Sequence, residues 1–410
     1  MGLISERLKV LKGNLGVVLL SSGLWNLAGQ MTWSFFPLYV LGLGGSYVDI
    51  GLISAMDAFV RIIPTLLGGY LADTIGRKKI VYTMSFLLAV NELIKAFAPF
   101  YQILFLSAAF GALWGGIREP AFRSLIADST DPDNRALSYA LWSIVPPLFG
   151  LFSPYAMGIM MDRYGTVVAL RWGYLFVFAT GVVASFIRYR FLEESLTLEE
   201  PVKMEIRSVV GKVIDDFRLT FRSMPRQFWT FFSIDMVLSL GWAMIDPYTV
   251  TFAKEVAGTT AAQWGMHMML WSMVNIVIRI PAARASDRSG RMKFIKPTML
   301  FYPVAILFLI NSRNFQGVLI ARLAIATLTS IDGSAYQSLY TDYIPREHRG
   351  RSNALKSLSW TVVWSIGSII GGYLYQEYSK TANFVVGAGL LTIGAVALIL
   401  FLKEPETKET

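Results

Sequence analysis

The sequence G-G-Y-L-A-D-T-I-G-R-K-K, from Gly68 to Lys79, decides the fold because part of it occurs twice in the chain. The segment A-D-T-I-G-R-K-K around Asp73 returns as S-D-R-S-G-R-M-K around Asp287, at an offset of 214 in the numbering. S-L-I-A-D, which ends at Asp128, returns as S-L-Y-T-D, which ends at Asp342, at the same offset. Two landmarks in one register indicate an internal repeat of two similar halves.

The composition places both halves in a membrane. Hydrophobic side chains make up 54% of the 410 residues and charged ones only 16%, whereas roughly 25% are charged in soluble proteins. Mean hydropathy is +0.50. Because a spanning helix needs about 20 apolar residues, the length accommodates twelve spans and leaves no room for a large soluble domain.

Long apolar runs bounded by Gly, Pro or charge clusters predict an all-α integral membrane protein with twelve transmembrane helices in two six-helix bundles. The expected helices cover residues 15–42, 47–72, 79–98, 101–126, 136–161 and 168–190, then 228–254, 263–284, 294–312, 317–342, 352–376 and 382–402. The domains are therefore an N-terminal bundle at 1–190, a linker at 191–227 and a C-terminal bundle at 228–410. Apolar residues at helical spacing in the linker predict an amphipathic helix, either in the membrane interface or solvated.

The net charge of +9 describes topology rather than a nucleic-acid partner, because basic residues collect on cytoplasmic loops. With the N-terminus inside, 27 Lys and Arg fall on cytoplasmic segments and six on outer ones. Both termini are therefore expected in the cytoplasm, and the chain is expected in the plasma membrane as a monomer. No cysteine and only two histidines argue against a metal site, a cofactor or enzyme chemistry.

The loop at Gly68–Lys79 resembles the signature loop of the major facilitator superfamily, and the two six-helix halves extend that resemblance over the whole chain. The resemblance implies that the loop latches the outward-facing state of a transporter, with the Asp and Arg residues after helices 4 and 10 as gate partners. The alternative is a simple basic loop facing lipid headgroups. The expected cytoplasmic gate comprises Gly69, Asp73, Gly76, Arg77, Lys78, Asp128 and Arg135, and in the second half Asp287, Gly290, Arg291, Asp342 and Arg349.

Charged residues within the expected spans are the candidates for mechanism, because a charge at mid-bilayer costs at least ~2.5 kcal/mol. A carboxylate near an Arg in a cavity can exchange a proton as its surroundings change, which is the chemistry that proton coupling needs. The alternative is a set of structural ion pairs that neutralise one another. The candidates for proton coupling or charge relay are Asp57, Arg61, Arg118, Glu119, Asp246 and Asp332.

Polar and aromatic residues in the spans are candidates for a substrate cavity. Aromatic rings could stack on a substrate, although interfacial belts and packing explain such rings equally. Amide groups could bind a ligand or join helices. The candidates are Asn26, Gln30, Trp33, Tyr39, Trp242 and Asn275.

Two family patterns are altered. The helix 4 motif of proton-coupled members has an Arg four residues before a Gly, and counting back from Gly111 gives Ser107. The glycine-rich helix 5 motif of antiporters is replaced by P-P-L-F-G-L-F-S-P, from Pro146 to Pro154.

The sequence thus predicts a secondary transporter of a small molecule, of the drug or metabolite permease type, working by alternating access. Protons and the lipid bilayer are its expected partners. A uniporter, a lipid or lysolipid flippase and a non-transporting receptor or scaffold are the alternatives.

Overall fold

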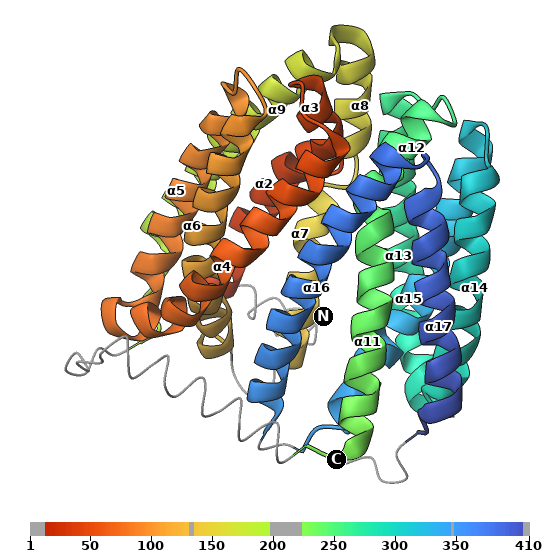
Figure 1. Ribbon diagram of the computed structural model, residues 1–410. Helices are drawn as coiled ribbons and strands as arrows, with labels where there is room; N and C mark the ends of the chain where they lie inside the picture. Colours follow the sequence, from red (N-terminus) through yellow and green to blue (C-terminus); the bar gives the residue numbers. More distant parts are fainter. Residues whose placement is uncertain (1–12, 131–134, 197–223, 346–347, 405–410) are drawn as a thin grey trace, which may run out of the picture. The chain divides into compact units, whose positions relative to one another are not determined.

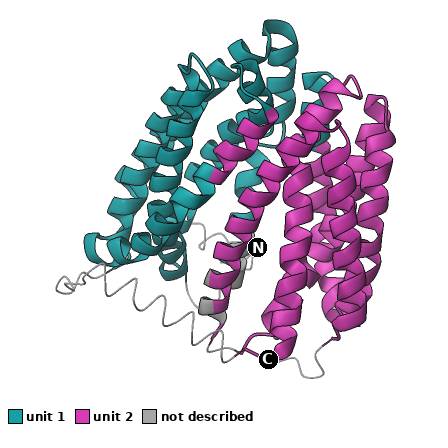
Figure 2. Ribbon diagram, viewed as in Figure 1, with its two compact units in different colours: residues 1–46, 56–202, 260–269 teal, residues 47–55, 203–259, 270–410 magenta. Residues whose placement is uncertain are grey.

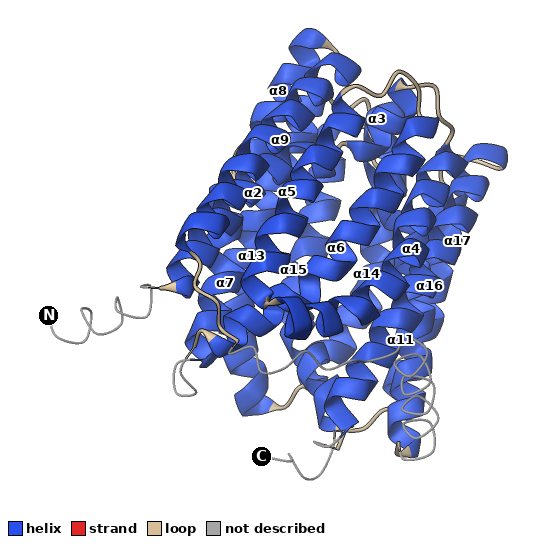
Figure 3. Ribbon diagram, turned by 90° about the vertical axis from the view of Figure 1, so that its left-hand side faces the viewer, coloured by secondary structure: helices blue, strands red, loops and turns tan. Residues whose placement is uncertain are grey.

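The computed structural model describes residues 13–130, 135–196, 224–345 and 348–404, and these contain helices and no strands (Figures 1 and 3). The first half contains α2 (Asn14–Trp33), α3 (Phe36–Gly42), α4 (Tyr47–Ile75), α5 (Arg77–Ala96), α6 (Gln102–Asp128), α7 (Arg135–Phe149), α8 (Ser153–Tyr164) and α9 (Thr166–Phe191). The second contains α11 (Arg226–Ile245), the 3-10 turn η2 (Asp246–Tyr248), α12 (Thr249–Glu255), α13 (Ala261–Ser289), α14 (Met292–Asn311), α15 (Phe315–Asp342), α16 (Arg349–Glu377) and α17 (Ala382–Phe401). The expected linker helix falls at 197–223, outside the described residues.

Eight helical segments of the described chain are long and apolar enough to cross a membrane. They are Tyr47–Ile75, Leu141–Tyr164, Thr166–Phe191, Arg226–Glu255, Ala261–Ser289, Met292–Asn311, Phe315–Asp342 and Ala382–Phe401. Several of them contain prolines, such as Pro64 in α4 and Pro281 in α13, and membrane helices tolerate proline when other groups satisfy the freed backbone positions. The prediction of an all-helical, multi-pass membrane protein is confirmed.

The described chain forms two compact units (Figure 2). In unit 1, α5 packs against α6 and α9, while α2 packs against α7 and α9. A cluster of small and branched apolar residues fills one part of this unit, with Val18, Ala72, Val81, Ala121 and Leu125 almost fully buried.

Unit 2 repeats this packing with the second copy of the repeat. Here α14, the counterpart of α5, packs against α15 and α17, and α11 packs against α16 and α17. The same four helix pairs therefore form in both units, as the repeated sequence motifs predict.

The units differ from the expected division at 1–190 and 228–410 because each contains the start of one helix from the other half. Residues 47–55, the start of α4, belong to unit 2, and residues 260–269, around the start of α13, belong to unit 1. The two helix starts occupy equivalent positions in the repeat, so each half of the sequence contributes the same segment to the other unit. Figure 2 shows the change of colour within α4.

Glycines allow residues 47–55 and 260–269 to pack closely within their units. A Cβ atom on Gly158 of α8 would lie 2.2 Å from the Ala261 carbonyl oxygen, and one on Gly372 of α16 would lie 2.6 Å from the Tyr47 carbonyl oxygen. Both are closer than any real carbon contact, so only a residue without a side chain allows the helix backbones to approach this far. Gly51 and Gly265, which also correspond in the repeat, make equivalent close approaches to α16 and α8.

Candidate functional site

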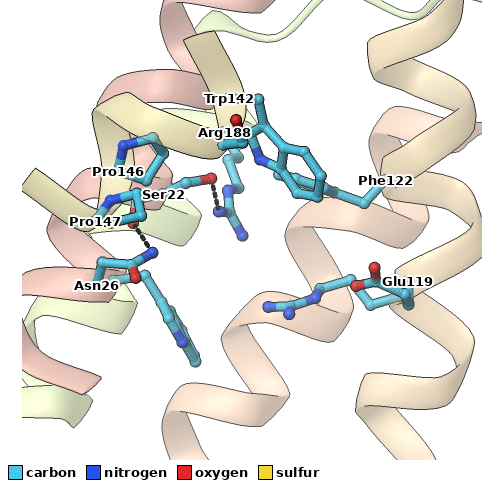
Figure 4. A pocket seen from close by; sticks show the side chains of 11 residues that line it. Ser22, Asn26, Glu119, Phe122, Trp142, Pro146, Pro147 and Arg188 are labelled. Atoms are coloured by element: carbon cyan, nitrogen blue, oxygen red, sulfur yellow. Dashed lines mark hydrogen bonds between the residues drawn. The ribbon is translucent and has the colours of Figure 1, made fainter. Parts of the chain in front are cut away.

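A pocket of about 280 Å³ lies inside unit 1 (Figure 4). It is formed by α2, α6, α7 and α9, and Pro146 and Pro147 of α7 form part of its wall. Figure 4 shows Arg188 extending into the space between Ser22 and Phe122, with Glu119 and Asn26 on opposite sides. The lining residues are Ser22, Trp25, Asn26, Arg118, Glu119, Phe122, Trp142, Ser143, Pro146, Pro147 and Arg188.

Arg188 is the most buried cation of this pocket, with 2% of its surface exposed. Its guanidinium donates hydrogen bonds to three hydroxyl groups, those of Ser21 and Ser22 on α2 and of Ser85 on α5. It also lies 5.0 Å from the centre of the Phe122 ring. The sequence did not single out Arg188 because, near the end of α9, it resembles one more basic residue of the cytoplasmic linker. Its serine partners lie on α2 and α5, far away along the chain, so no local pattern shows that Arg188 turns inward.

Arg118 and Glu119 were predicted from the sequence, and both line the pocket. The Arg118 guanidinium lies 5.5 Å from the Trp25 ring, and its buried Nε has no hydrogen-bond partner among the described residues. Glu119 instead accepts a hydrogen bond from Arg123, one turn further along α6, at 2.8 Å. The two adjacent charges therefore line the same pocket but make their nearest contacts with different side chains, Trp25 and Arg123.

Asp57 and Arg61 form an ion pair one turn apart on α4, at 2.8 Å, with each side chain about two-fifths exposed. Arg61 also lies beside Gly115 of α6, where an added Cβ would be 2.5 Å from its Nη1. Both were predicted as relay candidates, and the structure brings them together.

In unit 2, Asp332 is 4% exposed and lies in the middle of α15. The hydroxyl groups of Tyr302 and Thr298, both on α14, donate hydrogen bonds to its carboxylate at 2.9 to 3.0 Å. No described cation forms an ion pair with it. Trp242, a predicted cavity residue, packs edge-on against Tyr302 with 5.3 Å between ring centres.

A second acidic group of unit 2 was not among the candidates for proton coupling. Asp235 of α11 accepts a hydrogen bond from Tyr336 at 2.9 Å and pairs with Lys356 of α16 at 3.5 Å. Lys356 also lies 4.1 Å from the Tyr340 ring centre. Basic loop residues closely precede Lys356, so the sequence did not single it out. In the structure it lies inside α16, which begins before it and continues beyond it.

Asp246, another predicted candidate, begins the 3-10 turn η2 and is 3.8 Å from Arg322. Arg322 in turn lies over the Trp271 ring, at 4.5 Å. Asn275 donates to the Trp271 carbonyl oxygen and accepts from the Ser330 hydroxyl group, so it joins α13 to α15.

The other cavity candidates of the first half are dispersed. Asn26 lines the pocket and donates to the Ser22 carbonyl oxygen at 3.0 Å. Gln30 lies beside Gly150, and Trp33 is 69% exposed. Tyr39 is fully buried and donates to the Lys95 carbonyl oxygen.

The predicted gate loop of unit 1 has a defined geometry. Gly76 has φ 104°, a value that favours glycine, and α5 begins at the next residue. Arg77 forms ion pairs with Asp128 of α6 and, at 3.4 Å, with Asp73. The Glu194 carboxylate accepts hydrogen bonds from the backbone N–H groups of Arg77 and Lys78, each at 3.0 Å. A Cβ atom on Gly69 would lie 4.0 Å from Pro120, so this position is less crowded.

The second gate loop repeats this arrangement. Gly290 has φ 98°, Arg291 pairs with Asp342, and the Glu404 carboxylate accepts from the Arg291 backbone N–H at 2.9 Å. The sequence named both arginines but missed Glu194 and Glu404, which cap α5 and α14 from distant positions. The side chains of Arg135 and Arg349 lie outside the described residues, so their gate role stays a prediction, as does that of Asp287.

Two ionisable groups outside the spans are shifted by their surroundings. Burial raises the pKa of the Tyr343 phenol to about 12, and the nearby Glu404 carboxylate raises it as well. Burial lowers the pKa of Lys380, but hydrogen bonds to Tyr47 and Glu255 outweigh it, and the net pKa is raised. Lys380 lies 3.0 Å from the Glu255 carboxylate and 3.8 Å from the Tyr47 ring centre. Among the described residues, no group of His, Cys, Asp and Glu is arranged to hold a metal.

Duplicated units of apolar helices, with buried charges and a duplicated basic loop, define a membrane transporter. The chain belongs to the Major Facilitator Superfamily, whose sequence model matches residues 18–310 and 231–410. This confirms the family resemblance and the prediction of a transporter rather than an enzyme.

Relatives and solved structures agree with that assignment. The chain is 23% identical to an uncharacterized MFS-type transporter of Methanocaldococcus jannaschii, over 87% of this chain and 91% of the relative. It is 21% identical to the quinolone resistance protein NorA of Staphylococcus aureus, over 91% and 92%. The structure of the xylose transporter XylE from E. coli matches with a TM-score of 0.71 and 14% identity, over 96% of this chain and 97% of the other.

Proposed function

We propose that this chain is a proton-coupled secondary transporter that moves a small molecule by alternating access. The basic-residue distribution of 27 to 6 supports twelve spans with both termini in the cytoplasm. We place this transporter in the plasma membrane. Family membership supports transport, and the buried acidic groups support coupling to protons.

Asp332 carries the proposal. An ionised carboxylate at 4% exposure loses its hydration, and its described partners are two neutral hydroxyl groups rather than a cation. Burial without a counter-charge favours the protonated acid, whereas contact with water favours the carboxylate. A change of water access during transport would therefore load and release a proton at this residue.

Asp235 supports the same proposal because it joins α11, α15 and α16 through Tyr336 and a cation, Lys356. Protonation of Asp235 would break that ion pair and leave a buried ammonium group without its partner, which costs several kcal/mol. The two acids thus couple proton occupancy to helix contacts in unit 2.

The duplicated gate loops fit alternating access. The pairs Arg77–Asp128 and Arg291–Asp342 each tie the start of one helix to the end of another. Ion pairs of this kind contribute little as static stabilisers, but they bias an equilibrium when they form in one state only.

The test uses purified protein in proteoliposomes and a ligand panel that includes a quinolone, since ligands raise the apparent stability of the folded state. The ligand that gives the largest thermal shift is then followed as transport substrate with and without a pH gradient. The wild type should accumulate it only with the gradient.

Asp332→Asn mimics the protonated acid, so it should keep substrate binding and exchange but lose accumulation driven by the gradient. Glu377→Gln, an exposed acid at the end of α16, is the matched control and should behave as wild type. Gradient-driven accumulation at wild-type level in Asp332→Asn would disprove this role. Equal wild-type transport with and without the gradient would indicate a uniporter.

A further inference from the structure

We propose that the pocket of unit 1 is a subsite for the negatively charged group of a small organic anion, held between Arg118 and Arg188. This inference rests on the proposed transport function and names the class of its substrate. It is carried by the charge of the pocket, the shape of its walls and the partners of its two arginines.

Arg188 differs from two other embedded cations of unit 1, Arg61 and Lys95, which both have carboxylate partners. Arg61 pairs with Asp57, and Lys95 pairs with Glu92 at 2.8 Å. Arg188 is more buried than either, yet no described carboxylate forms an ion pair with it, and its partners are three neutral serine hydroxyl groups. The serines fix the direction of the guanidinium without cancelling its charge.

Arg118 supplies a second positive charge to the same pocket. Its buried Nε has no described hydrogen-bond partner, and its neighbour Glu119 is bound to Arg123. A guanidinium offers donors in a planar fork that matches the two oxygens of a carboxylate. Two such groups lining one pocket, with one carboxylate already bound elsewhere, favour an anionic occupant and disfavour a cationic one.

The remaining walls indicate what the anion carries. Trp25, Phe122 and Trp142 are aromatic, and Pro146 and Pro147 are apolar. Such walls bind a flat apolar body, while the volume of about 280 Å³ limits its size to the lower end of small-molecule sites. The site therefore fits an aromatic carboxylate better than inorganic phosphate, which would leave these walls without contacts.

The experiment measures binding of two probes with the same ring system and opposite charge, naphthoate and naphthylmethylammonium, to the full chain in phosphatidylcholine nanodiscs by calorimetry. Naphthoate should bind, and the ammonium probe should bind at least about tenfold more weakly. Binding of both probes with equal affinity, or no naphthoate binding at millimolar concentration, would overturn the proposal.

Variants locate the binding. Arg118→Gln and Arg188→Gln should each weaken naphthoate binding by about 10- to 100-fold, since each removes hydrogen bonds between charged groups. Arg190→Gln is the matched control, because Arg190 is exposed on the same helix two residues on and lies against the Phe191 ring. Wild-type affinity in folded Arg118→Gln would overturn the proposal even if Arg188→Gln failed to fold, and Arg188→Lys then tests that position.

Glu119 gives a change of the opposite sign. Glu119→Gln removes the one carboxylate of the pocket lining, so naphthoate should bind about 2- to 5-fold more tightly. Weaker binding in this variant would contradict the charge argument.

Two additional measurements distinguish a lipid from a free anion, and binding from transport. If phosphatidylglycerol in the nanodiscs abolishes naphthoate binding through Arg118, the pocket holds a lipid headgroup rather than a free organic anion, and the proposal fails. Proteoliposome uptake separates the subsite from the proposed function. If naphthoate binds through both arginines but is not transported, the subsite proposal stands and the transport proposal is contradicted. If other compounds are transported but naphthoate does not bind, the transport proposal stands and the subsite proposal is contradicted.

Discussion

The close approach of α8 to the start of α13 makes Gly158 a sensitive position. Gly158→Ala would place a Cβ 2.2 Å from the Ala261 carbonyl oxygen and 2.6 Å from the Ala262 Cα. Ordinary carbon contacts begin near 3.5 Å, so the two backbones would have to separate by about 1.3 Å. Overpacking of this kind costs about 1–3 kcal/mol.

Replacing a glycine inside a helix by alanine also stabilises the helix by about 0.5–1 kcal/mol, which partly offsets the overpacking cost. The control must therefore be another Gly→Ala substitution inside a helix. Gly389 of α17 provides it, because an added Cβ there meets no atom within 4 Å. Gly389→Ala should therefore be neutral or stabilising. The difference between the two variants isolates the overpacking cost.

Thermal unfolding in detergent measures this difference. With about 2 °C per kcal/mol for a protein of this size, Gly158→Ala should unfold about 2–6 °C below Gly389→Ala. Gly372→Ala, the counterpart in unit 2, should shift in the same direction, because its Cβ would lie 2.6 Å from the Tyr47 carbonyl oxygen. Equal unfolding temperatures for Gly158→Ala and Gly389→Ala would refute the reasoning that these helices touch through their backbones.

Two further substitutions test polar contacts. Glu194→Ala removes the acceptor for two backbone N–H groups at the start of α5 and should destabilise the protein by about 0.5–2 kcal/mol. Glu193→Ala, at an exposed neighbouring position, is the control and should leave the stability unchanged. Identical unfolding temperatures for the two variants would argue against capping by Glu194. Lys380→Met removes the ion pair with Glu255 and should lower the unfolding temperature at neutral pH by about 2 °C. Because the folded-state pKa of Lys380 is raised, its contribution is complete below the ordinary value of 10.5 and is lost as pH rises through the folded-state pKa. The gap between wild type and Lys380→Met should narrow in that range, and a constant gap would contradict the ionic contribution.

Features that depend on local pattern and register could be predicted from the sequence. Arg77 and Asp128 correspond to Arg291 and Asp342 in the repeat, and the structure joins each couple into an equivalent ion pair. A glycine before a basic helix start predicted the turns, since a positive φ is a local property of the backbone.

Contacts between distant segments were beyond the sequence. Arg188 looks like one more basic residue of a cytoplasmic linker, and only Ser21 and Ser85, 167 and 103 residues away, show that it is buried. Glu194 reaches Lys78 across 116 residues. Such partners depend on how whole helices pack. Residues more than 100 positions apart show no pattern in a single sequence that would pair them.

The exchanged helix starts impose an order on assembly of the chain as it leaves the ribosome. When residues 260–269 are synthesised, α8 already exists, since Ser153–Tyr164 precedes them. Residues 47–55, in contrast, pack against Ser368 and Gly372 of α16, which are synthesised much later. A nascent chain that stops before α16 therefore lacks the backbone that packs against Gly51, so the start of α4 reaches its final packing only late in synthesis.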